Sequence, residues 1–309
     1  MKSGLLFPGQ GSQFVGMGQS LARCFPEARE AFEEADDILR FALSRLAWEG
    51  PQEVLTATEN AQPALYVHSL AAYRVARDRI GPVGAAAGHS LGELTAHGAA
   101  GTYSFADGLR LVRLRGELMA RAGTAAPGAM AAVIGLSADS VAALCREAAD
   151  TGLTVVSANL NSKSQIVVSG ELAGVEWLCS AAKASGAKRA VPLTVSAAFH
   201  SPLMRPVAAE FRECLDDVAF RSPSFPVVSN VTAEVEGDPD RIRQLLVRQL
   251  TSPVRWIECV ARARAEGVTR FLELGPGRVL TGLNRRNARG VPTSAIGEPD
   301  SIDSMEGWI

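Results

Sequence analysis

The most constraining stretch of the sequence is Gly88-His89-Ser90-Leu91-Gly92-Glu93. It has the Gly-x-Ser-x-Gly spacing of a nucleophile elbow, a sharp strand-to-helix turn that exposes a serine hydroxyl. Both glycines are needed because the strand and helix backbones approach so closely that a Cβ would collide. The flanks agree, since an apolar run at residues 83–87 precedes the turn and helix-favouring residues follow it. Such a pattern also arises by chance, so the motif alone leaves the role of Ser90 open.

The composition of the chain narrows the class of protein. Its 309 residues are 47% hydrophobic, and 31 basic residues nearly balance 33 acidic ones, so no overall field favours nucleic acid. Its five scattered cysteines form no CxxC pair, which favours reduced thiols and indicates no zinc site. No apolar run reaches ~18 residues, and residues 1–6 lead directly into a Gly-rich loop, leaving no room for a signal peptide. We therefore expect a cytoplasmic protein that binds no metal, no nucleic acid and no membrane.

Apolar runs separated by helical patterns predict an α/β fold with a parallel sheet. Four buried strands are expected, at residues 3–7, 83–87, 225–229 and 269–274. In the mostly helical region before the elbow, Gln62-Pro63-Ala64-Leu65 predicts the start of a helix, because proline is tolerated in a first turn. Farther along, residues 249–256 are interpreted as a loop with a polar start.

A breaker pair, Pro127-Gly128, separates this region from a different pattern. Strand and helix signals then follow in the order strand, helix, strand, strand, helix, strand, and end near Val195. This is the order of a ferredoxin-like unit. We therefore predict a large α/β-hydrolase-like domain with a parallel sheet, formed by residues 1–127 and 196–309, and an inserted ferredoxin-like small domain over residues 128–195.

Arg115 is expected to be a buried cation. It lies in a helical pattern that runs to about residue 122, and its neighbours three and four positions away include Leu111, Leu118 and Met119. An arginine on the apolar side of a helix needs an anionic partner. That partner is either an acidic side chain elsewhere in the chain or a carboxylate on a substrate, which the planar guanidinium would bind with two hydrogen bonds.

Two loops offer the other groups that a reactive serine needs. The loop at residues 8–13 follows a buried strand but matches no phosphate-binding pattern, so its backbone N–H groups are available to an oxyanion. His200 lies in a loop after the serine in sequence, as the base does in hydrolases with an elbow serine. Together with Ser90 and Arg115, it is the favoured general base.

Seven segments in a fixed order then add up to a family resemblance: Pro8–Gln13, Gln62–Ala64, Gly88–Glu93, Arg115-Gly116, Phe199–Ser201, Gln249 and Glu273–Gly277. They resemble malonyl-CoA:acyl-carrier-protein transacylases and the related acyltransferase domains of polyketide synthases. The resemblance covers nearly the whole chain.

The resemblance implies catalytic roles for five residues. Ser90 is the expected nucleophile and His200 its base. The backbone carbonyl of Gln249 is expected to orient the histidine in place of a triad aspartate, and the backbone N–H groups of Gln10 and Leu91 to form the oxyanion hole.

The resemblance also implies an acyl pocket. Arg115 is expected to hold the malonyl carboxylate, with Gln62 and Asn159 as further polar residues of the pocket. Phe199 stands just before the histidine, where a bulky side chain is associated with malonyl units.

The implied reaction moves a malonyl group from malonyl-CoA, through an ester on the serine, to the phosphopantetheine thiol of an acyl carrier protein. It belongs to fatty-acid or polyketide biosynthesis, needs no cofactor and is expected in a monomer. The carrier is expected at a cleft between the domains, near five basic residues: Lys163, Lys188, Arg189, Arg285 and Arg286.

Two alternatives from other classes remain. A serine thioesterase or acyl hydrolase could use the same elbow, and a catalytically silent module could bind carrier proteins. Arg115 and the inserted domain weigh against a generic esterase, which needs no carboxylate clamp. Intact Ser90, His200 and Gln249 weigh against the silent module.

Overall fold

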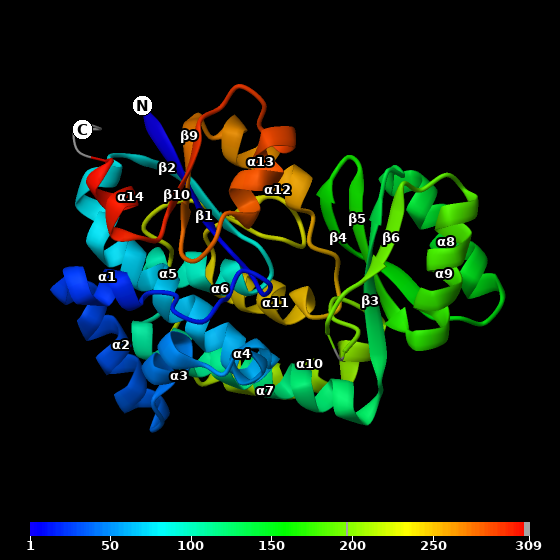
Figure 1. The fold of residues 1–309 in the computed structure, drawn as a ribbon, viewed down its shortest axis with the longest axis horizontal. Coiled ribbons are helices and arrows are strands. Elements are labelled where there is room, and N and C mark those ends of the chain that lie inside the picture. Colours follow the sequence, from blue (N-terminus) through cyan, green and yellow to red (C-terminus); the bar gives the residue numbers. More distant parts are fainter. Residues whose placement is uncertain (196, 306–309) are drawn as a thin grey trace.

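A six-stranded sheet with the strand order β10-β9-β1-β2-β7-β8 forms the centre of the larger part of the protein (Figure 1). The computed structural model describes residues 1–195 and 197–305. The strands of this sheet are β1 (Lys2–Phe7), β2 (Val83–Gly88), β7 (Val227–Val228), β8 (Val235–Glu236), β9 (Val268–Leu274) and β10 (Thr293–Ile296). All neighbouring pairs are parallel except β7 with β8. The predicted parallel sheet is confirmed, although β7 is shorter than the strand expected at 225–229.

Helices cover both faces of this sheet, which is why its central strands are apolar throughout. The helices are α1 (Gln19–Cys24), α2 (Pro26–Leu39), α3 (Leu43–Glu49), α4 (Gln52–Thr56), α5 (Thr58–Ile80), α6 (Leu91–Ala99), α7 (Phe105–Ala125), α10 (Arg205–Asp216), α11 (Pro239–Gln249), α12 (Trp256–Ala265), α13 (Val279–Asn287) and α14 (Pro299–Asp303). Leu5 and Phe7 of β1 join the core on the side of α5 and α6. Leu6, which lies between them, joins a second core with α12 and α13.

A separate four-stranded antiparallel sheet has the order β4-β5-β3-β6. Its elements are β3 (Gly128–Ile134), α8 (Ala138–Asp150), β4 (Val155–Ser162), β5 (Gln165–Glu171), α9 (Leu172–Ala184) and β6 (Arg189–Pro192). Order and alternation are those of a ferredoxin-like unit, as predicted. The exact domain boundaries stay a prediction, and the second of them involves residue 196, which lies outside the described residues.

The small sheet is joined to the larger part of the protein at two places. Where the chain enters and leaves the small sheet, Gly128 packs so closely on Ala198 that an added Cβ would lie 2.7 Å from the Cβ of Ala198. Farther along, Asn159 of β4 forms a parallel bridge with Val254, in the segment between α11 and α12. The peptide groups there exchange hydrogen bonds of 2.8 and 2.9 Å. The small sheet is thereby tied to the segment that follows Gln249.

The helix expected to begin at Gln62 begins earlier, at Thr58, so this prediction is wrong. Pro63 is therefore inside α5, where its missing N–H leaves the carbonyl of Glu59 without its usual helical donor. The guanidinium of Arg113, on α7, donates to that carbonyl at 3.0 Å instead. A side chain from a neighbouring helix thus compensates for the proline, and no local sequence signal reports this.

The sequence predicts a loop that starts at Gln249, and the structure corrects this start by one residue. Gln249 is the last residue of α11, and the loop begins after it. At a helix end the last carbonyl groups have no intrahelical donor. The carbonyl of Gln249 is therefore free to accept a hydrogen bond from elsewhere.

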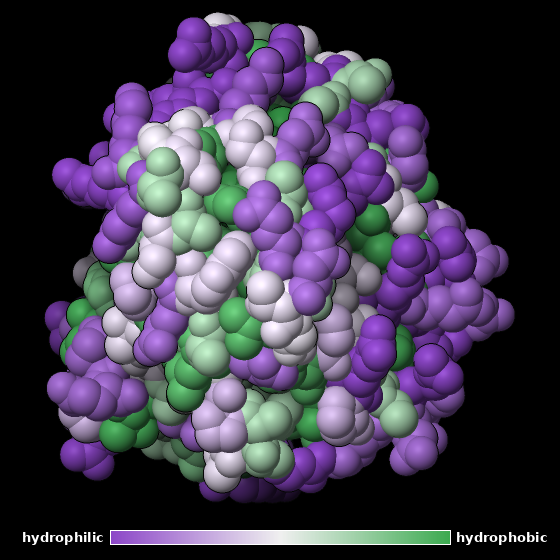
Figure 2. All heavy atoms as spheres, turned by 90° about the vertical axis from the view of Figure 1, so that its right-hand side faces the viewer, coloured by the Kyte–Doolittle hydropathy of each residue, from purple (hydrophilic) through white to green (hydrophobic). Residues whose placement is uncertain are grey.

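The outer face of the small sheet's helices is largely polar. Figure 2 shows strongly hydrophilic residues around a central area of near-neutral ones, with strongly hydrophobic residues only in small separate spots. This fits helices α8 and α9, whose apolar residues pack inward on the sheet. Within the described ranges, none of the helices combines the length and apolar character that a membrane crossing requires.

Candidate active site

Ser90 lies at the tip of the turn between β2 and α6, as the elbow motif predicts. The glycines on either side are sterically required. A Cβ on Gly88 would lie 1.8 Å from the backbone of Gly92, and a Cβ on Gly92 would lie 2.0 Å from the carbonyl oxygen of Phe7. Strand β1, strand β2 and helix α6 therefore meet at a spacing that only glycine permits.

The two residues expected to react both have backbone angles that are rare for side-chain-bearing residues. The φ of Ser90 is 54° and that of His200 is 58°. Such strain persists only where the surroundings impose it, and it is concentrated at functional sites. At Ser90, part of that constraint comes from Asn230, whose side chain accepts from the N–H of Ser90 and donates to the carbonyl of Gly88, each at 2.8 Å.

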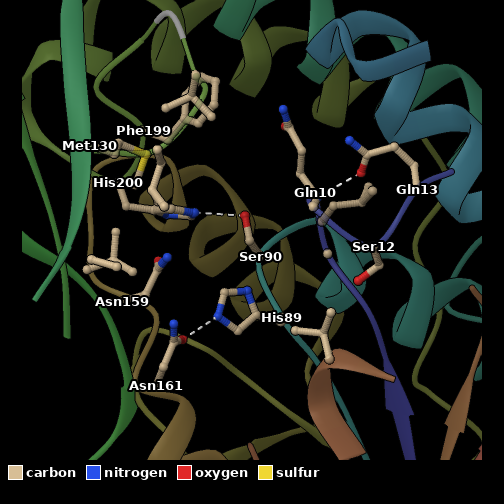
Figure 3. A pocket seen from close by; sticks show the side chains of 18 of the residues that line it. Gln10, Ser12, Gln13, His89, Ser90, Met130, Asn159, Asn161, Phe199 and His200 are labelled. Carbon is tan, nitrogen blue, oxygen red and sulfur yellow. Dashed lines mark hydrogen bonds between the residues drawn. The ribbon is translucent and has the colours of Figure 1, made fainter. Parts of the chain in front are cut away.

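His200 faces the hydroxyl of Ser90 (Figure 3), with 2.7 Å between Nε2 and Oγ. Its Nδ1 lies 2.9 Å from the backbone carbonyl of Gln249, which can only accept, so Nδ1 holds the proton and Nε2 accepts from Ser90. Burial, together with the positive charge of Arg115, lowers the pKa of His200 to about 3. The imidazole is therefore neutral at pH 7, as a general base must be.

Gln10 and Leu91 line the same cavity as Ser90. Leu91 is the first residue of α6, where helix N–H groups have no internal partner and the dipole favours negative charge. Neither N–H has a hydrogen-bond partner among the described residues. An oxyanion hole requires unpaired backbone donors of this kind, and both residues share the cavity of the serine.

Arg115 is 1% exposed and its guanidinium lies between three side-chain oxygens. Nη1 donates to Oε1 of Gln62 at 2.7 Å, and Nη2 donates to Oε1 of Gln249 at 2.9 Å and to Oγ of Ser90 at 3.1 Å. Burial lowers the pKa of Arg115 to about 10, with Glu93 opposing the shift, so the group is still cationic at pH 7. No carboxylate of the described residues forms an ion pair with it, and its buried Nε has no partner there. Of the two partners considered from the sequence, an internal acid in direct ion-pair contact is not found among the described residues, although the charge of Glu93 acts on Arg115 from farther away.

Eight of the nine residues singled out from the sequence line one cavity of about 450 Å³: Gln10, Gln62, Ser90, Leu91, Arg115, Asn159, Phe199 and His200. Gln249 lies behind this wall, fully buried. Phe199 and Met130 form one side of the cavity in Figure 3, with Gln10 on the side across Ser90. The Oδ1 of Asn159 is buried without a partner among the described residues, so it is an acceptor available to a ligand.

Two further hydrogen-bonded groups shape the cavity. His89, next to the nucleophile, is 2.8 Å from Oδ1 of Asn161 through Nε2, and burial lowers its pKa (Figure 3). Thr58 donates to the side chain of Gln10 at 2.7 Å and accepts from Nε2 of Gln62 at 3.2 Å. The second group, centred on Thr58, fixes Gln10 and gives Gln62 the orientation in which its oxygen faces Arg115.

Sequence reasoning missed Asn230 and Glu93. Asn230 follows a buried strand at the carboxyl end of a parallel sheet, a position that often holds ligand or catalytic groups, and this signal could have identified it. Glu93 was noted only as part of the elbow motif.

No cluster of three or more His, Cys, Asp or Glu side chains suited to a metal ion occurs within residues 1–195 and 197–305.

Comparisons with known proteins agree on one family. The family model for the acyl transferase domain matches residues 5–296. A malonyl CoA-acyl carrier protein transacylase of Bacillus subtilis (strain 168) is 45% identical over 302 residues, which is 98% of this chain and 95% of that protein. Among solved structures, an acyl carrier protein S-malonyltransferase from Vibrio cholerae O1 biovar eltor str. N16961 superposes with a TM-score of 0.95 at 42% identity, covering 99% of this chain and 100% of that one.

A second solved structure is similar to the same extent. It is a type II PKS acyl-carrier protein in complex with its malonyl-transacylase, with a TM-score of 0.95 and 43% identity over 99% of both chains.

Proposed function

The chain belongs to the acyl transferase domain family, and we propose that Ser90 carries the malonyl group that this enzyme moves from malonyl-CoA to an acyl carrier protein. The enzyme is a malonyl-CoA:acyl-carrier-protein transacylase, and the acyl carrier protein is its partner. The pathway that receives the malonyl group is fatty-acid or polyketide biosynthesis.

In the first half-reaction Ser90 attacks the thioester. His200 accepts the proton of the Ser90 hydroxyl on Nε2, while its Nδ1–H stays bonded to the carbonyl of Gln249. The negative charge that develops on the thioester oxygen is bound by the N–H groups of Gln10 and Leu91. The C–S bond then breaks, His200 returns its proton to the departing sulfur, and the malonyl group stays on Ser90 as an ester.

In the second half-reaction the phosphopantetheine thiol of the carrier takes the place of CoA. His200 removes the thiol proton, the sulfur attacks the ester carbonyl, and the oxyanion is bound at the same two N–H groups. When the C–O bond breaks, Ser90 recovers its proton from His200. The scheme uses only side chains and backbone groups of this chain together with its two thiols, so we propose that it needs no cofactor.

The observation that supports malonyl as the acyl group is the unpaired guanidinium of Arg115. Within the described residues Glu93 reaches this buried cation only through the amide of Gln249, so a ligand carboxylate would be its direct anionic partner. The free carboxylate of a malonyl ester on Ser90 would accept from the unpartnered Nε, since Ser90 Oγ already lies 3.1 Å from Nη2. An esterase has no use for such a clamp, so a thioesterase or hydrolase activity is not favoured. We also propose that a monomer suffices, because every site residue comes from one chain.

The test is the formation of an acyl-enzyme. The protein is incubated with malonyl-CoA and no acceptor, and its intact mass is measured. We expect one malonyl adduct on the wild type and none on Ser90→Ala. The matched control is Ser12→Ala, since Ser12 lines the same cavity and its variant should keep the adduct. An adduct that persists on Ser90→Ala would refute the assignment of the nucleophile.

A further inference from the structure

A buried carboxylate lies directly beneath the elbow, outside the cavity. Glu93 is 1% exposed and occupies the third position of α6, where the helix dipole favours a negative charge. One of its oxygens accepts from Nε2 of Gln249 at 2.6 Å. No Lys or Arg of the described residues forms an ion pair with it. A direct ion pair therefore does not explain why Glu93 is buried, and another role for its carboxylate is needed.

The amide of Gln249 connects Glu93 to Arg115. Its Nε2 donates to Glu93 and to the backbone carbonyl of Ser90, at 2.6 and 2.9 Å, while its Oε1 accepts from Nη2 of Arg115 at 2.9 Å. If the amide were turned over, its oxygen would face two acceptors and its NH₂ would face a guanidinium donor. An ionised Glu93 accepts only, so it allows one orientation of Gln249.

We propose that Glu93 is a positioning residue for acyl selectivity: through the Gln249 amide it holds Arg115 where the carboxylate of a malonyl group binds. This inference rests on the proposed function. Glu93 contacts neither substrate nor reacting atoms; it acts by fixing which end of the Gln249 side chain faces the clamp. Removing its charge should therefore harm the transfer of a carboxylated acyl group more than the transfer of a plain one.

The protonation of Glu93 offers a readout that a purely structural residue would lack. Burial raises the pKa of Glu93 to about 7, although hydrogen bonds from Gln249 and residues 229–230 and the charge of Arg115 oppose the shift. The other titratable groups around it do not titrate near pH 7. Burial raises the pKa of Cys259 and Tyr103, while Arg115 stays charged and His200 stays neutral. Selectivity for malonyl should thus decrease as the pH falls through about 7.

The experiment measures kcat/KM for acylation of Ser90 by malonyl-CoA and by acetyl-CoA, which lacks a carboxylate. For Glu93→Gln we expect a loss of about ten- to a hundredfold with malonyl-CoA and of less than about threefold with acetyl-CoA, the size of one charge-assisted hydrogen bond. The matched control is Glu273→Gln. Glu273 is also fully buried and accepts from two N–H groups of α13, so its variant should lower stability without changing the ratio of the two substrates.

Two further measurements separate positioning from folding. In an Arg115→Ala background, Glu93→Gln should cause no further loss with malonyl-CoA, because the group through which it acts is gone. In the wild type, the malonyl-to-acetyl ratio should fall as the pH is lowered through about 7, and in Glu93→Gln it should be flat over the same range. The wild-type profile needs no variant to fold.

The outcomes are distinguishable. Equal losses with both substrates, additive losses in the double variant, or a wild-type ratio independent of pH would each overturn the role of Glu93. A wild type that forms no malonyl ester at all would instead overturn the proposed function.

Discussion

Arg115 shows how much of the chemistry rests on one residue. Its Nη2 contacts the nucleophile itself, so in the free enzyme the guanidinium and His200 share the hydroxyl of Ser90. In the proposed function a substrate carboxylate would compete for that guanidinium, which would connect recognition of the acyl group to the state of the nucleophile. The group proposed to bind the substrate and the group proposed to activate the serine thus both contact the same hydroxyl.

Arg115→Ala should distinguish a carboxyacyl transferase from a hydrolase. Removing one partner of a buried, hydrogen-bonded charge pair costs roughly 2–5 kcal/mol, or about 30- to 4,000-fold. We expect a loss of that size in kcat/KM for malonyl-CoA and a small one for acetyl-CoA. Arg115→Lys should restore only part, because an ammonium lacks the planar fork. Acylation of Ser90 by both thioesters is the measurement, and equal losses would make Arg115 a structural residue.

The site residues differ in how far the sequence could reveal them. Ser90 has a local motif, and Arg115 is marked by apolar neighbours at helical spacing. The link from Glu93 through Gln249 to Arg115 joins residues far apart in the chain. Such contacts depend on the packing of α6, α7 and α11 together, and local patterns contain no information on them. The family resemblance supplied Gln249 but not the orientation of its side chain.

At the scale of elements, the site depends on the close approach of β1, β2 and α6, whose backbones meet with no side chain between them. Strand β1 passes so close to α6 that Gly92 has no room for a Cβ. The helix end at Gln249 matters for a different reason, because a backbone carbonyl is available to His200 only where α11 stops. The strand and helix pattern was predictable, whereas the early start of α5 and the exact end of α11 were not, since partners from other elements decide both.

Gly92→Ala should therefore be strongly destabilising. The added methyl would lie 2.0 Å from the carbonyl oxygen of Phe7, so β1 and α6 must separate. We expect the free energy of unfolding to fall by about 3 kcal/mol or more, measured by urea denaturation. The control is Gly282→Ala in α13, where a Cβ would meet nothing within 4 Å. That variant should gain up to about 1 kcal/mol from helix propensity, and equal effects of both changes would contradict the steric argument.

At the scale of the whole molecule, buried histidines make stability depend on pH. Burial lowers the pKa of His68 to about 4 and that of His97 to about 3, and it also lowers the pKa of His89 and His200. Unfolded histidines titrate near 6.5. The stabilising contribution is therefore complete above about pH 6.5 and is lost as the pH falls toward the folded values. Glu93 opposes this trend, because its raised pKa lets the folded state hold a proton that the unfolded chain releases.

We expect the free energy of unfolding to fall by about 3 kcal/mol per pH unit between about pH 6.5 and about pH 4.5, for two to three protons taken up on unfolding. Urea denaturation across this range is the measurement. His97→Asn should remove about one of these protons and so reduce the dependence of the unfolding free energy on pH by ~1.4 kcal/mol per pH unit. His97 suits this test because it bonds to Thr102 and lies outside the cavity. Stability that does not change over the range would refute the prediction.

The carrier protein should dock where the basic residues named from the sequence gather. Lys163 lies in the turn two residues before Gln165, which lines the cavity, and Arg189 is separated from Gln165 by Ile134, which pairs with both. On α13, Arg285 and Arg286 stand just before Asn287, whose side chain bonds to the carbonyl of Asn161 at 2.8 Å. The named basic residues are exposed: Lys163, Lys188, Arg189, Arg285 and Arg286. An acidic carrier that docks across the small sheet and α13 would meet positive charge from both parts of the protein.

Charge reversal tests this docking face. For Lys163→Glu combined with Arg286→Glu, we expect slower malonyl transfer to the carrier and a weaker salt dependence, since rim charges act mainly on association. Transfer to free pantetheine should change little. Reversal of Arg23, exposed on α1, is the control. An unchanged rate and salt dependence with the carrier would place the docking face elsewhere.

The contact between Gly128 and Ala198 bears on how such enzymes diversify. Because the chain enters and leaves the small sheet at nearly one point, the intervening segment could be exchanged without a new spacing of its ends, provided that the bridge between β4 and Val254 is kept. An exchange would replace Met130 and Asn159 in the cavity wall and leave Ser90, Arg115 and His200 in place. We expect such an exchange to alter which acyl groups are accepted, while the three residues assigned to acyl transfer stay unchanged.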